Sequence, residues 1–496
     1  MSGKSPEIIV IGGGIAGLSA ALTASEAGAS VTILERAPLD ERGGNTRFSN
    51  AAMRAVYDGV EDIARLVDDF SDQDRARADF GRYTREQYID DMARVTQYRT
   101  DPDLAELMVE RSGETIRWLR QNGVKFLPLY DWHPKLPDGR IKFTGGSAVE
   151  AWGAGEGIVQ ALFDSAEKRG IKVQYETRAI ALVENERGVC GVEAMRNRHR
   201  FKIPCDAVVL GCGGFEANAE WRTKYLGPSW EFAKVRGSRF NTGDGLRMAL
   251  DIGAMSCGHW SGCHAASWDL NAPDVNELAF GTVFKRDDFM YGILVNALGE
   301  RFVDEGADIR ALAYAKLGKI IIAQPGQFAW QVFDAKSASL LHPEYRTRRS
   351  ARVTADTIEE LAGKLEGVNA TAFLATVEAY NRAVRTDIPL DIATRDGRGT
   401  TGLAILKSNW ATTIDTPPFE AYGVTCGITF TFGGIRIDLG GRVIDVDGKV
   451  IPGLYAAGEM VGGLFYFNYP GGAGLTSAAV FGRVAGESAA ADNAKD

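Results

Sequence analysis

The feature that most constrains this chain is a glycine-rich turn directly after a short apolar run near the N-terminus. Residues 8–11 (Ile-Ile-Val-Ile) run into Gly12-x-Gly14-x-x-Gly17, and a second apolar run further along the chain ends at Glu35. This spacing predicts the strand–turn–helix–strand unit that binds a dinucleotide. Gly12 would make the tight turn, Gly14 would let a pyrophosphate approach the helix N-terminus, and Gly17 would allow close helix–strand packing. Glu35 would accept hydrogen bonds from a ribose.

A second glycine-rich turn lies near the C-terminus. Residues 453–459 are typical of a strand that ends at an acid, and residues 468–475 (Asn-Tyr-Pro-Gly-Gly-Ala-Gly-Leu) lead into a small-residue helix. An extended FAD needs such a second turn, because its helix N-terminus can face the flavin pyrimidine ring, where negative charge gathers on reduction. Glycine is frequent from Gly423 to the end of the chain, but it is sparse between Arg310 and Tyr422. The sequence therefore predicts a cofactor cradle built from both ends of the chain and a glycine-poor unit between them.

Composition excludes several other classes of protein. The 496 residues carry a formal charge of -9 without a basic stripe, so nucleic acid is not an expected partner. The six cysteines form no CxxC pair, which argues against a zinc ribbon, an iron–sulfur cluster or a c-type haem, and no metal site is expected. No apolar run reaches about 18 residues and no signal-type segment precedes the first strand, so we expect a cytoplasmic protein without a membrane span.

Four further segments carry a likeness to a known family. They are Gly43-Gly44-Asn45-Thr46, Gly211-Cys212-Gly213-Gly214-Phe215, Thr242-Gly243-Asp244-Gly245, and Gly299-Glu300-Arg301-Phe302 with Asp304-Glu305. With the two glycine-rich turns, they make the chain resemble the fumarate reductase/succinate dehydrogenase flavoprotein superfamily over residues 7–490. Within that superfamily, residues 300–308, 424–434 and 468–475 are most similar to FAD-dependent tricarballylate dehydrogenase.

The resemblance implies an α/β fold, with a Rossmann-type FAD-binding domain of the glutathione-reductase kind and an inserted α+β capping domain for the substrate. The expected division is FAD-binding domain 1–262, capping domain 263–428 and FAD-binding domain again 429–496. Succinate dehydrogenases attach FAD through a histidine near residues 43–53, and no histidine precedes His133 here, so FAD should be non-covalent. FAD contacts are expected from Gly12, Gly14, Ile15, Ala16, Gly17, Glu35, Arg36, Gly44, Asn45, Thr46, Ser49, Ala179, Gly213, Asp244, Gly458, Glu459, Gly474 and Leu475.

The same resemblance implies hydride transfer between flavin N5 and a carbon beside a carboxylate, while a proton leaves or joins the adjacent carbon. Arg310 matches the arginine that carries this proton in fumarate reductases, although its spacing from Glu305 is one residue longer than usual. Arginine is a poor base at its usual pKa, so it would need a relay to acids such as Glu305 or Asp308. His264 matches a substrate-binding histidine of the family. Arg310 could instead form a surface salt bridge, and His264 could be a structural histidine.

Two positions depart from fumarate reductase. Phe430 and Tyr469 stand about where that family holds the second carboxylate with a His and an Arg, so fumarate and succinate are not the expected substrates. Arg286 is a candidate replacement for this anion site, or part of a charged surface loop. The turn from Tyr469 to Ala473 is also similar to 3-ketosteroid dehydrogenases, in which a Tyr hydroxyl and a backbone N–H polarise a ketone. Tyr469 and the Ala473 amide are candidates for that role, and Tyr466 is a candidate for lining the substrate pocket.

The leading hypothesis is an FAD-dependent dehydrogenase that introduces a C=C bond next to a carboxylate or carbonyl of a small organic acid, tricarballylate-like. The alternatives are an α,β-desaturase of a cyclic keto acid or ketone, and an ene-reductase that runs in reverse. A flavin redox protein without substrate chemistry is disfavoured, because the glycine-poor unit resembles a substrate-capping domain. The sequence has no cluster or haem motif, so electrons should leave to a separate acceptor, which could be a protein, a quinone or oxygen.

Overall fold

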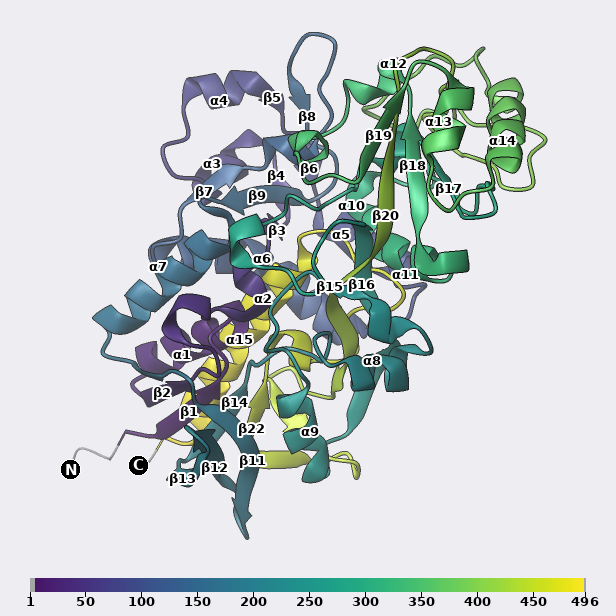
Figure 1. The fold of residues 1–496 in the computed structure, drawn as a ribbon. Helices are drawn as coiled ribbons and strands as arrows, with labels where there is room; N and C mark the ends of the chain where they lie inside the picture. The colour runs from purple at the N-terminus through teal and green to yellow at the C-terminus, as the bar shows by residue number, and fades with distance from the viewer. Residues whose placement is uncertain (1–4, 495–496) are drawn as a thin grey trace.

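The structure, a computed structural model, describes residues 5–494. Its cofactor half is built on a six-stranded sheet with the order β10-β2-β1-β14-β22-β21, parallel throughout except for β21 (Figure 1). The central strands consist of buried Ile, Val, Leu and Ala, as expected for a parallel sheet covered on both faces. The predicted Rossmann-type α/β fold is therefore confirmed. The strands are β1 Glu7–Ile11, β2 Ser30–Leu34, β10 Lys172–Gln174, β14 Ala207–Leu210, β21 Arg442–Ile444 and β22 Val450–Ala456.

Two helices from opposite ends of the chain, α1 (Ile15–Glu26) and α15 (Ala473–Asp492), pack side by side against this sheet (Figure 1). A Cβ on Gly482 would lie 2.4 Å from the Ala16 carbonyl oxygen, and one on Gly486 would lie 2.4 Å from the Ala20 carbonyl oxygen. The glycines therefore allow contact between the two backbones, and their order shows that the helices run in the same direction. At this register α15 starts about eight residues before α1, so its N-terminus projects roughly 12 Å further.

A second sheet forms the centre of the predicted capping domain. Its long strand β20 (Phe419–Ile435) pairs with β15, β16, β18 and β19, and it runs from the cap at the upper right of Figure 1 into the middle of the molecule. The expected domain boundaries at 262/263 and 428/429 fall inside β16 and β20, so paired strands join the two proposed domains. The other members are β15 Lys234–Val235, β16 Ser256–Asp269, β17 Ile293–Val295, β18 Ala329–Phe333 and β19 Arg352–Ala355, with cap helices α10 Arg310–Ala313, α11 Leu317–Ile322, α12 Ala335–Ala338, α13 Ile358–Lys364 and α14 Ala370–Ala383.

The rest of the described chain covers the edges of these two sheets. An antiparallel sheet β3-β9-β7 and the helices α3 and α4 lie at the upper left of Figure 1, α5 and α6 lie nearer its middle, and β11, β12 and β13 form a separate antiparallel sheet. Within residues 5–494, every helix is too short or too polar to cross a lipid bilayer. These strands are β3 Ala52–Arg54, β4 Tyr57–Asp58, β5 Ala78–Asp79, β6 Arg82–Tyr83, β7 Phe126–Pro128, β8 Ile141–Lys142, β9 Ser147–Ala151, β11 Arg178–Asn185, β12 Gly188–Arg196 and β13 His199–Pro204, and these helices are α2 Gly44–Arg47, α3 Val60–Leu66, α4 Asp72–Arg77, α5 Arg85–Val95, α6 Pro102–Gln121, α7 Ala154–Lys168, α8 Ala219–Leu226 and α9 Asp244–Asp251.

Candidate active site

A long cavity extends from the glycine-rich turn after β1 to the base of the cap. The residues expected to contact FAD line this cavity, with the exception of Gly17. Gly17 lies behind the wall, where a Cβ would come within 2.0 Å of the Gly12 carbonyl oxygen. This placement agrees with the packing role that we expect for Gly17. The cradle therefore combines segments from the two ends of the chain.

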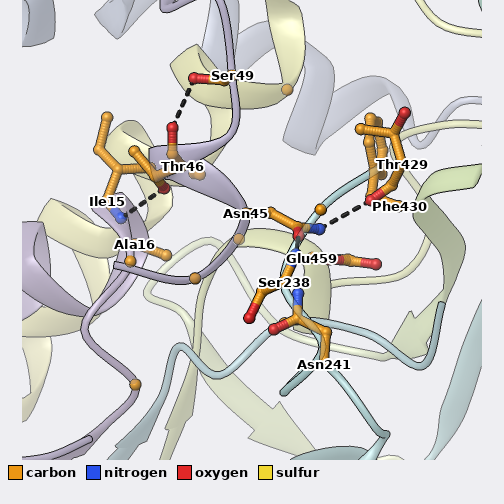
Figure 2. A pocket seen from close by; sticks show the side chains of 18 of the residues that line it. Ile15, Ala16, Asn45, Thr46, Ser49, Ser238, Asn241, Thr429, Phe430 and Glu459 are labelled. Atoms are coloured by element: carbon orange, nitrogen blue, oxygen red, sulfur yellow. Dashed lines mark hydrogen bonds between the residues drawn. The ribbon is translucent and has the colours of Figure 1, made fainter. Parts of the chain in front are cut away.

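The N-terminus of α1 forms one anion-binding part of the cavity. Its capping residue, Gly14, offers no side chain, and a Cβ there would meet nothing closer than Thr46 Oγ1 at 3.4 Å. The Ile15 amide donates to Thr46 Oγ1 at 3.0 Å, and Ser49 Oγ donates to the Thr46 carbonyl at 2.7 Å (Figure 2). The first turn of a helix has amide groups without intrahelical partners, so this open end suits a pyrophosphate.

Glu35 is a buried carboxylate at the end of β2. Its two oxygens accept the Gly13 amide at 2.9 Å and the Ala37 amide at 2.8 Å. Burial is the main reason that its pKa lies above the ordinary value. A Cβ on Gly13 would lie 2.5 Å from Glu35 Oε2, so a side chain at the second position of the fingerprint would displace the Glu35 carboxylate from its present contacts. The spacing pattern alone does not show this conflict.

Asp244 closes the cavity near the same edge of the sheet. Arg178 forms two hydrogen bonds to its carboxylate, each 2.7 Å, and Arg36 Nη1 adds a third at 3.0 Å. Arg36 also donates to Thr242 Oγ1 at 2.5 Å. The two guanidinium groups that line this end are therefore paired with protein acceptors.

Asn45 is held from several sides in the middle of the cavity. Its Nδ2 donates to Glu216 Oε1 at 2.5 Å and to the Thr429 carbonyl at 2.7 Å, while its Oδ1 accepts the Ser238 amide at 2.8 Å (Figure 2). Glu216 is fully buried, and burial together with the neighbouring Glu459 carboxyl holds the pKa of Glu216 well above its ordinary value. Burial therefore favours the protonated form of the Glu216 carboxyl beneath Asn45.

The far end of the cavity is aromatic and holds two phenols in contact. Tyr314 Oη and Tyr469 Oη lie 2.5 Å apart, and burial raises the pKa of both groups. The His264 ring packs against both, with centroid distances of 5.0 and 4.9 Å, and Phe430 is its cross-strand partner on β20. The strand register is irregular directly after His264, and such bulges re-aim side chains. Burial lowers the pKa of His264 well below its ordinary value, so its ring is uncharged.

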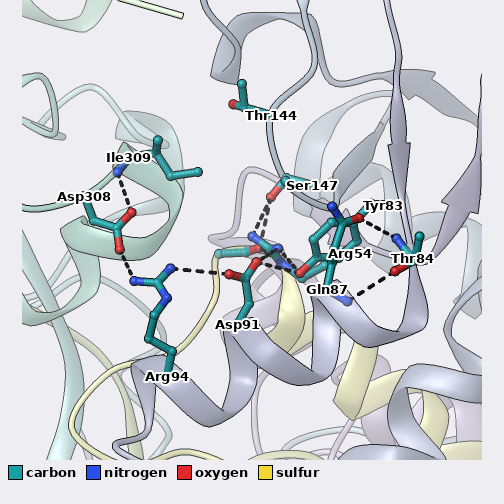
Figure 3. A network of polar contacts seen from close by, with 12 residues as sticks. Arg54, Tyr83, Thr84, Gln87, Asp91, Arg94, Thr144, Ser147, Asp308 and Ile309 are labelled. Carbon is teal, nitrogen blue, oxygen red and sulfur yellow. Dashed lines mark hydrogen bonds and ion pairs between the residues drawn. The ribbon is translucent and has the colours of Figure 1, made fainter. Parts of the chain in front are cut away.

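The turn that carries Tyr469 is anchored from below by Arg54. This fully buried guanidinium donates to the Gly471 carbonyl at 2.8 Å, and Ser147 Oγ donates to the same oxygen at 3.0 Å. Arg54 also donates to Tyr83 Oη at 2.8 Å and pairs with Asp91 at 3.4 Å, as Figure 3 shows. The network continues from Asp91 through Arg94 to Asp308, directly before α10. It therefore ties the turn to the start of the segment that supplies Tyr314.

Two predicted catalytic or substrate-binding cations, Arg310 and Arg286, lie outside the cavity. Arg310 does not line the cavity; its Nη1 pairs with Asp288 Oδ1 at 3.2 Å and its Nη2 donates to the Asp131 carbonyl at 3.1 Å. Arg286 is completely buried and pairs with Asp269 at 2.8 Å, and its remaining donors are bonded to backbone carbonyls and Ser350. The expected roles of Arg310 in proton transfer and of Arg286 in anion binding disagree with these placements, because neither guanidinium reaches the cavity.

Two other expectations are displaced by one residue. The Ala473 amide is already bonded to the Pro470 carbonyl at 3.0 Å, whereas Gly474, next along the first turn of α15, lines the cavity. Tyr466 stacks on His259 with a centroid distance of 5.9 Å outside the cavity, and Phe465 lines the cavity in its place. The ketone-polarising role of the Ala473 amide and the pocket-lining role of Tyr466 are therefore corrected.

Sequence reasoning missed four polar or aromatic residues that line the aromatic end. Tyr314 and Lys285 come from the cap, Arg236 directly follows β15, and Trp268 lies in β16. A usable signal exists for only one of them: Lys285 stands next to Arg286, which the charged run at 285–288 singles out. The other three lie far from any recognisable motif.

The residues of the cavity fit FAD. An open helix N-terminus for the pyrophosphate, a buried acid after β2 and a second helix N-terminus roughly 12 Å further along match an extended dinucleotide that ends in a flavin. No histidine lies along the cradle except His264 at the aromatic end, which agrees with a non-covalent cofactor.

Comparisons with known proteins agree with this geometry. The fumarate reductase (cytochrome) of Shewanella frigidimarina is 28% identical over 488 residues, which cover 98% of this chain and 77% of the relative. The 3-oxosteroid 1-dehydrogenase of Mycolicibacterium smegmatis is 26% identical, with 98% of this chain and 97% of the relative covered. The solved 3-ketosteroid delta1-dehydrogenase of Sterolibacterium denitrificans has the same fold, with a TM-score of 0.75 at 21% identity over 98% of this chain and 99% of that one. A family model described as an FAD binding domain matches residues 7–475, so this chain belongs to the FAD binding domain family and is an FAD-dependent oxidoreductase.

Proposed function

We propose that this protein introduces a C=C bond next to the carbonyl group of a ketone, by α,β-desaturation at a CH–CH group. The observation that carries the proposal is the pair of phenols, Tyr314 and Tyr469, whose oxygens lie 2.5 Å apart beside the first turn of α15. The names of the relatives, fumarate reductase and 3-oxosteroid 1-dehydrogenase, support chemistry at a CH–CH or C=C group. FAD, when bound, supplies the hydride acceptor.

The carbonyl oxygen of the ketone is assigned to the side of the aromatic end that α15 forms. Tyr469 donates its phenolic hydrogen to the ketone oxygen, since burial keeps the phenol protonated at neutral pH. The Gly474 amide, in the first turn of α15, is the second donor, and the helix N-terminus favours the negative charge that develops on the oxygen. Polarising the carbonyl in this way weakens the adjacent C–H bond, as an oxyanion hole does.

Tyr314 is assigned the removal of the proton from the carbon next to the carbonyl. In a ketone, the carbonyl oxygen and the α-hydrogen lie close together. Of the two phenols in contact, Tyr469 can therefore bind the oxygen while Tyr314 accepts the α-proton. Burial raises the pKa of Tyr314 well above its ordinary value, and only the ionised phenol accepts a proton. The rate should therefore rise with pH throughout the neutral and mildly alkaline range. The His264 ring is already uncharged across that range. If His264 accepted the proton, the rate would therefore not rise with pH.

A tricarballylate-like acid is the less supported substrate. The proton carrier that this hypothesis needs, Arg310, lies outside the cavity. Arg36 and Arg178 are paired with Asp244, which leaves two lining cations among the described residues to meet three carboxylates. We propose that the similarity of residues 300–308, 424–434 and 468–475 to tricarballylate dehydrogenase reflects common descent and not a shared substrate.

One experiment separates these substrates. Purified holoenzyme is mixed anaerobically with 4-oxocyclohexanecarboxylate, a 3-ketosteroid, tricarballylate or succinate, and the loss of flavin absorbance is followed. We expect a ketone to bleach the flavin, and Tyr469→Phe to slow the bleaching about 100- to 1000-fold. Tyr466→Phe is the matched control, because this tyrosine lies three residues earlier and outside the cavity. Bleaching by tricarballylate alone, or equal rates for the two variants, would refute the proposal.

A further inference from the structure

The cap side of the aromatic end concentrates hydrogen-bond donors that have no acceptor. Arg236 Nε and Nη1 and Trp268 Nε1 are buried without a partner among the described residues, and both side chains line the cavity. Both ring nitrogens of His264 are also unpartnered. Buried polar groups are normally hydrogen-bonded, so a cluster of free donors in a cavity indicates a missing acceptor.

Arg236 is held in place by packing instead of by an ion pair. Its guanidinium carbon lies 4.6 Å from the centre of the Trp268 ring. A Cβ on Gly427 would lie 2.8 Å from the Arg236 side chain, so this strand position must lack a side chain for the arginine to pass. Gly427 and Trp268 therefore form the space that the Arg236 side chain occupies, and the guanidinium charge of Arg236 is free to bind a ligand.

Lys285 adds a second cation from the cap. Its side chain is 9% exposed, and its Nζ lies 3.9 Å from Asp287 Oδ2, beyond hydrogen-bond distance. Asp287 is the nearest acid; it is buried, its Oδ1 is unpartnered, and burial raises its pKa. Burial lowers the pKa of Lys285, and Asp287, Glu344 and Asp288 oppose that shift, whereas Arg236 has no ion-pair partner among the described residues. A buried charge of this kind is costly without a counter-charge.

We infer that Arg236 and Lys285 form the subsite for a carboxylate of the substrate, so that the substrate is a keto acid and not a neutral ketone. The inference rests on the proposed function, because the ketone occupies the Tyr469 end of the same cavity. Arg236 can offer two parallel N–H groups to a carboxylate, and Trp268 Nε1 can offer one more. A neutral steroid would leave the same donors and the Arg236 charge without partners.

The test compares ligands that differ in one charge. The first measurement is the binding of unreactive cyclohexanecarboxylate and cyclohexanecarboxamide to the oxidised holoenzyme, followed by the change in flavin absorbance. We expect the acid to bind roughly 10- to 100-fold more tightly than the amide, the size expected for hydrogen bonds to charged groups. Arg236→Met should reduce this ratio to near one. Arg239→Met, an exposed cation three residues along the same segment that pairs with Glu41, should leave the ratio as in the wild type.

The second measurement is the anaerobic reduction of the flavin by 4-oxocyclohexanecarboxylate and by its methyl ester. We expect the acid to be favoured by a similar ratio in kcat/KM and Arg236→Met to abolish the preference. Equal binding of acid and amide, or an unchanged ratio in Arg236→Met, overturns the carboxylate subsite. Loss of FAD from Arg236→Met without a change in the ratio overturns it as well, because the arginine then serves the cofactor. If neither ketone reduces the flavin but the acid still binds selectively, the proposed reaction fails and the subsite stands.

Discussion

Replacement of Gly482 by alanine tests whether the contact between α1 and α15 sets the spacing of the cofactor cradle. The new Cβ would lie 2.4 Å from the Ala16 carbonyl oxygen and 2.9 Å from Ser19 Cβ, whereas ordinary contact begins near 3.4 Å. The helices must therefore separate by roughly 1 Å, since a backbone carbonyl cannot rotate away. Overpacking of this kind costs about 1–3 kcal/mol, which outweighs the gain of up to about 1 kcal/mol from replacing glycine within a helix.

The separation has a second consequence for the cofactor. The N-terminus of α1 and that of α15 both line the cavity, so moving one helix relative to the other misplaces two anchors for FAD. We expect Gly482→Ala to lower the midpoint of urea unfolding and to lower the flavin-to-protein absorbance ratio of the purified protein. Gly363→Ala, in α13, is the matched control, because a Cβ there meets nothing within 4 Å. It should stabilise the protein by about 0.5–1 kcal/mol. If both variants gain stability and retain FAD equally, the close helix contact does not govern the cradle.

Two further predictions concern residues outside the cavity. Arg310→Gln should leave the turnover number essentially unchanged and lower the free energy of unfolding by about 1–3 kcal/mol, because the buried Asp288 loses a charged partner; a large fall in turnover at saturating substrate would restore Arg310 to the reaction. Burial lowers the pKa of His133 to about 4, so the fold favours the neutral ring, and its contribution to stability is complete above pH 6.5 and lost as the pH falls toward 4. The difference in unfolding free energy between the wild type and His133→Gln should therefore shrink by about 3 kcal/mol between pH 7 and pH 4, and parallel pH curves would contradict this.

The cofactor half of the site could be predicted because its requirements are local. A glycine is needed where a backbone turns sharply, as at Gly12, or where two backbones touch, as at Gly17, and Gly14 leaves the helix N-terminus open; all three stand at fixed offsets from one strand end. The acid at the end of the next strand, Glu35, follows from the same unit. The rule is incomplete even here, because the conflict between a side chain at position 13 and that acid does not follow from the turn.

Part of the substrate half could be predicted by residue, because His264, Phe430 and Tyr469 line the cavity, but three other positions could be predicted only to within one residue. Lys285 lines the cavity in place of Arg286, Phe465 in place of Tyr466, and Gly474 in place of Ala473. Successive residues of an extended segment point to opposite sides, and successive residues of a helix differ by about 100°. A sequence pattern identifies the segment that reaches the site, but it does not determine which face of that segment is turned inward. That choice depends on the packing of the other face, as in the burial of Arg286 against Asp269.

Tyr314 lines the cavity in place of the expected Arg310, and this difference changes the chemistry that the site supports. Arg310 begins α10 and turns outward to Asp288, while the chain passes into a 3₁₀ turn at Tyr314, and this phenol reaches the cavity. A guanidinium beside a substrate would stabilise a carboxylate and pass protons through acids, which suits a dicarboxylic acid. A phenol in contact with a second phenol instead suits a carbonyl and the hydrogen beside it. Tyr314 and Tyr469 therefore support the proposed ketone at the α15 side of the aromatic end, while Arg236 and Lys285 support the proposed carboxylate at its cap side.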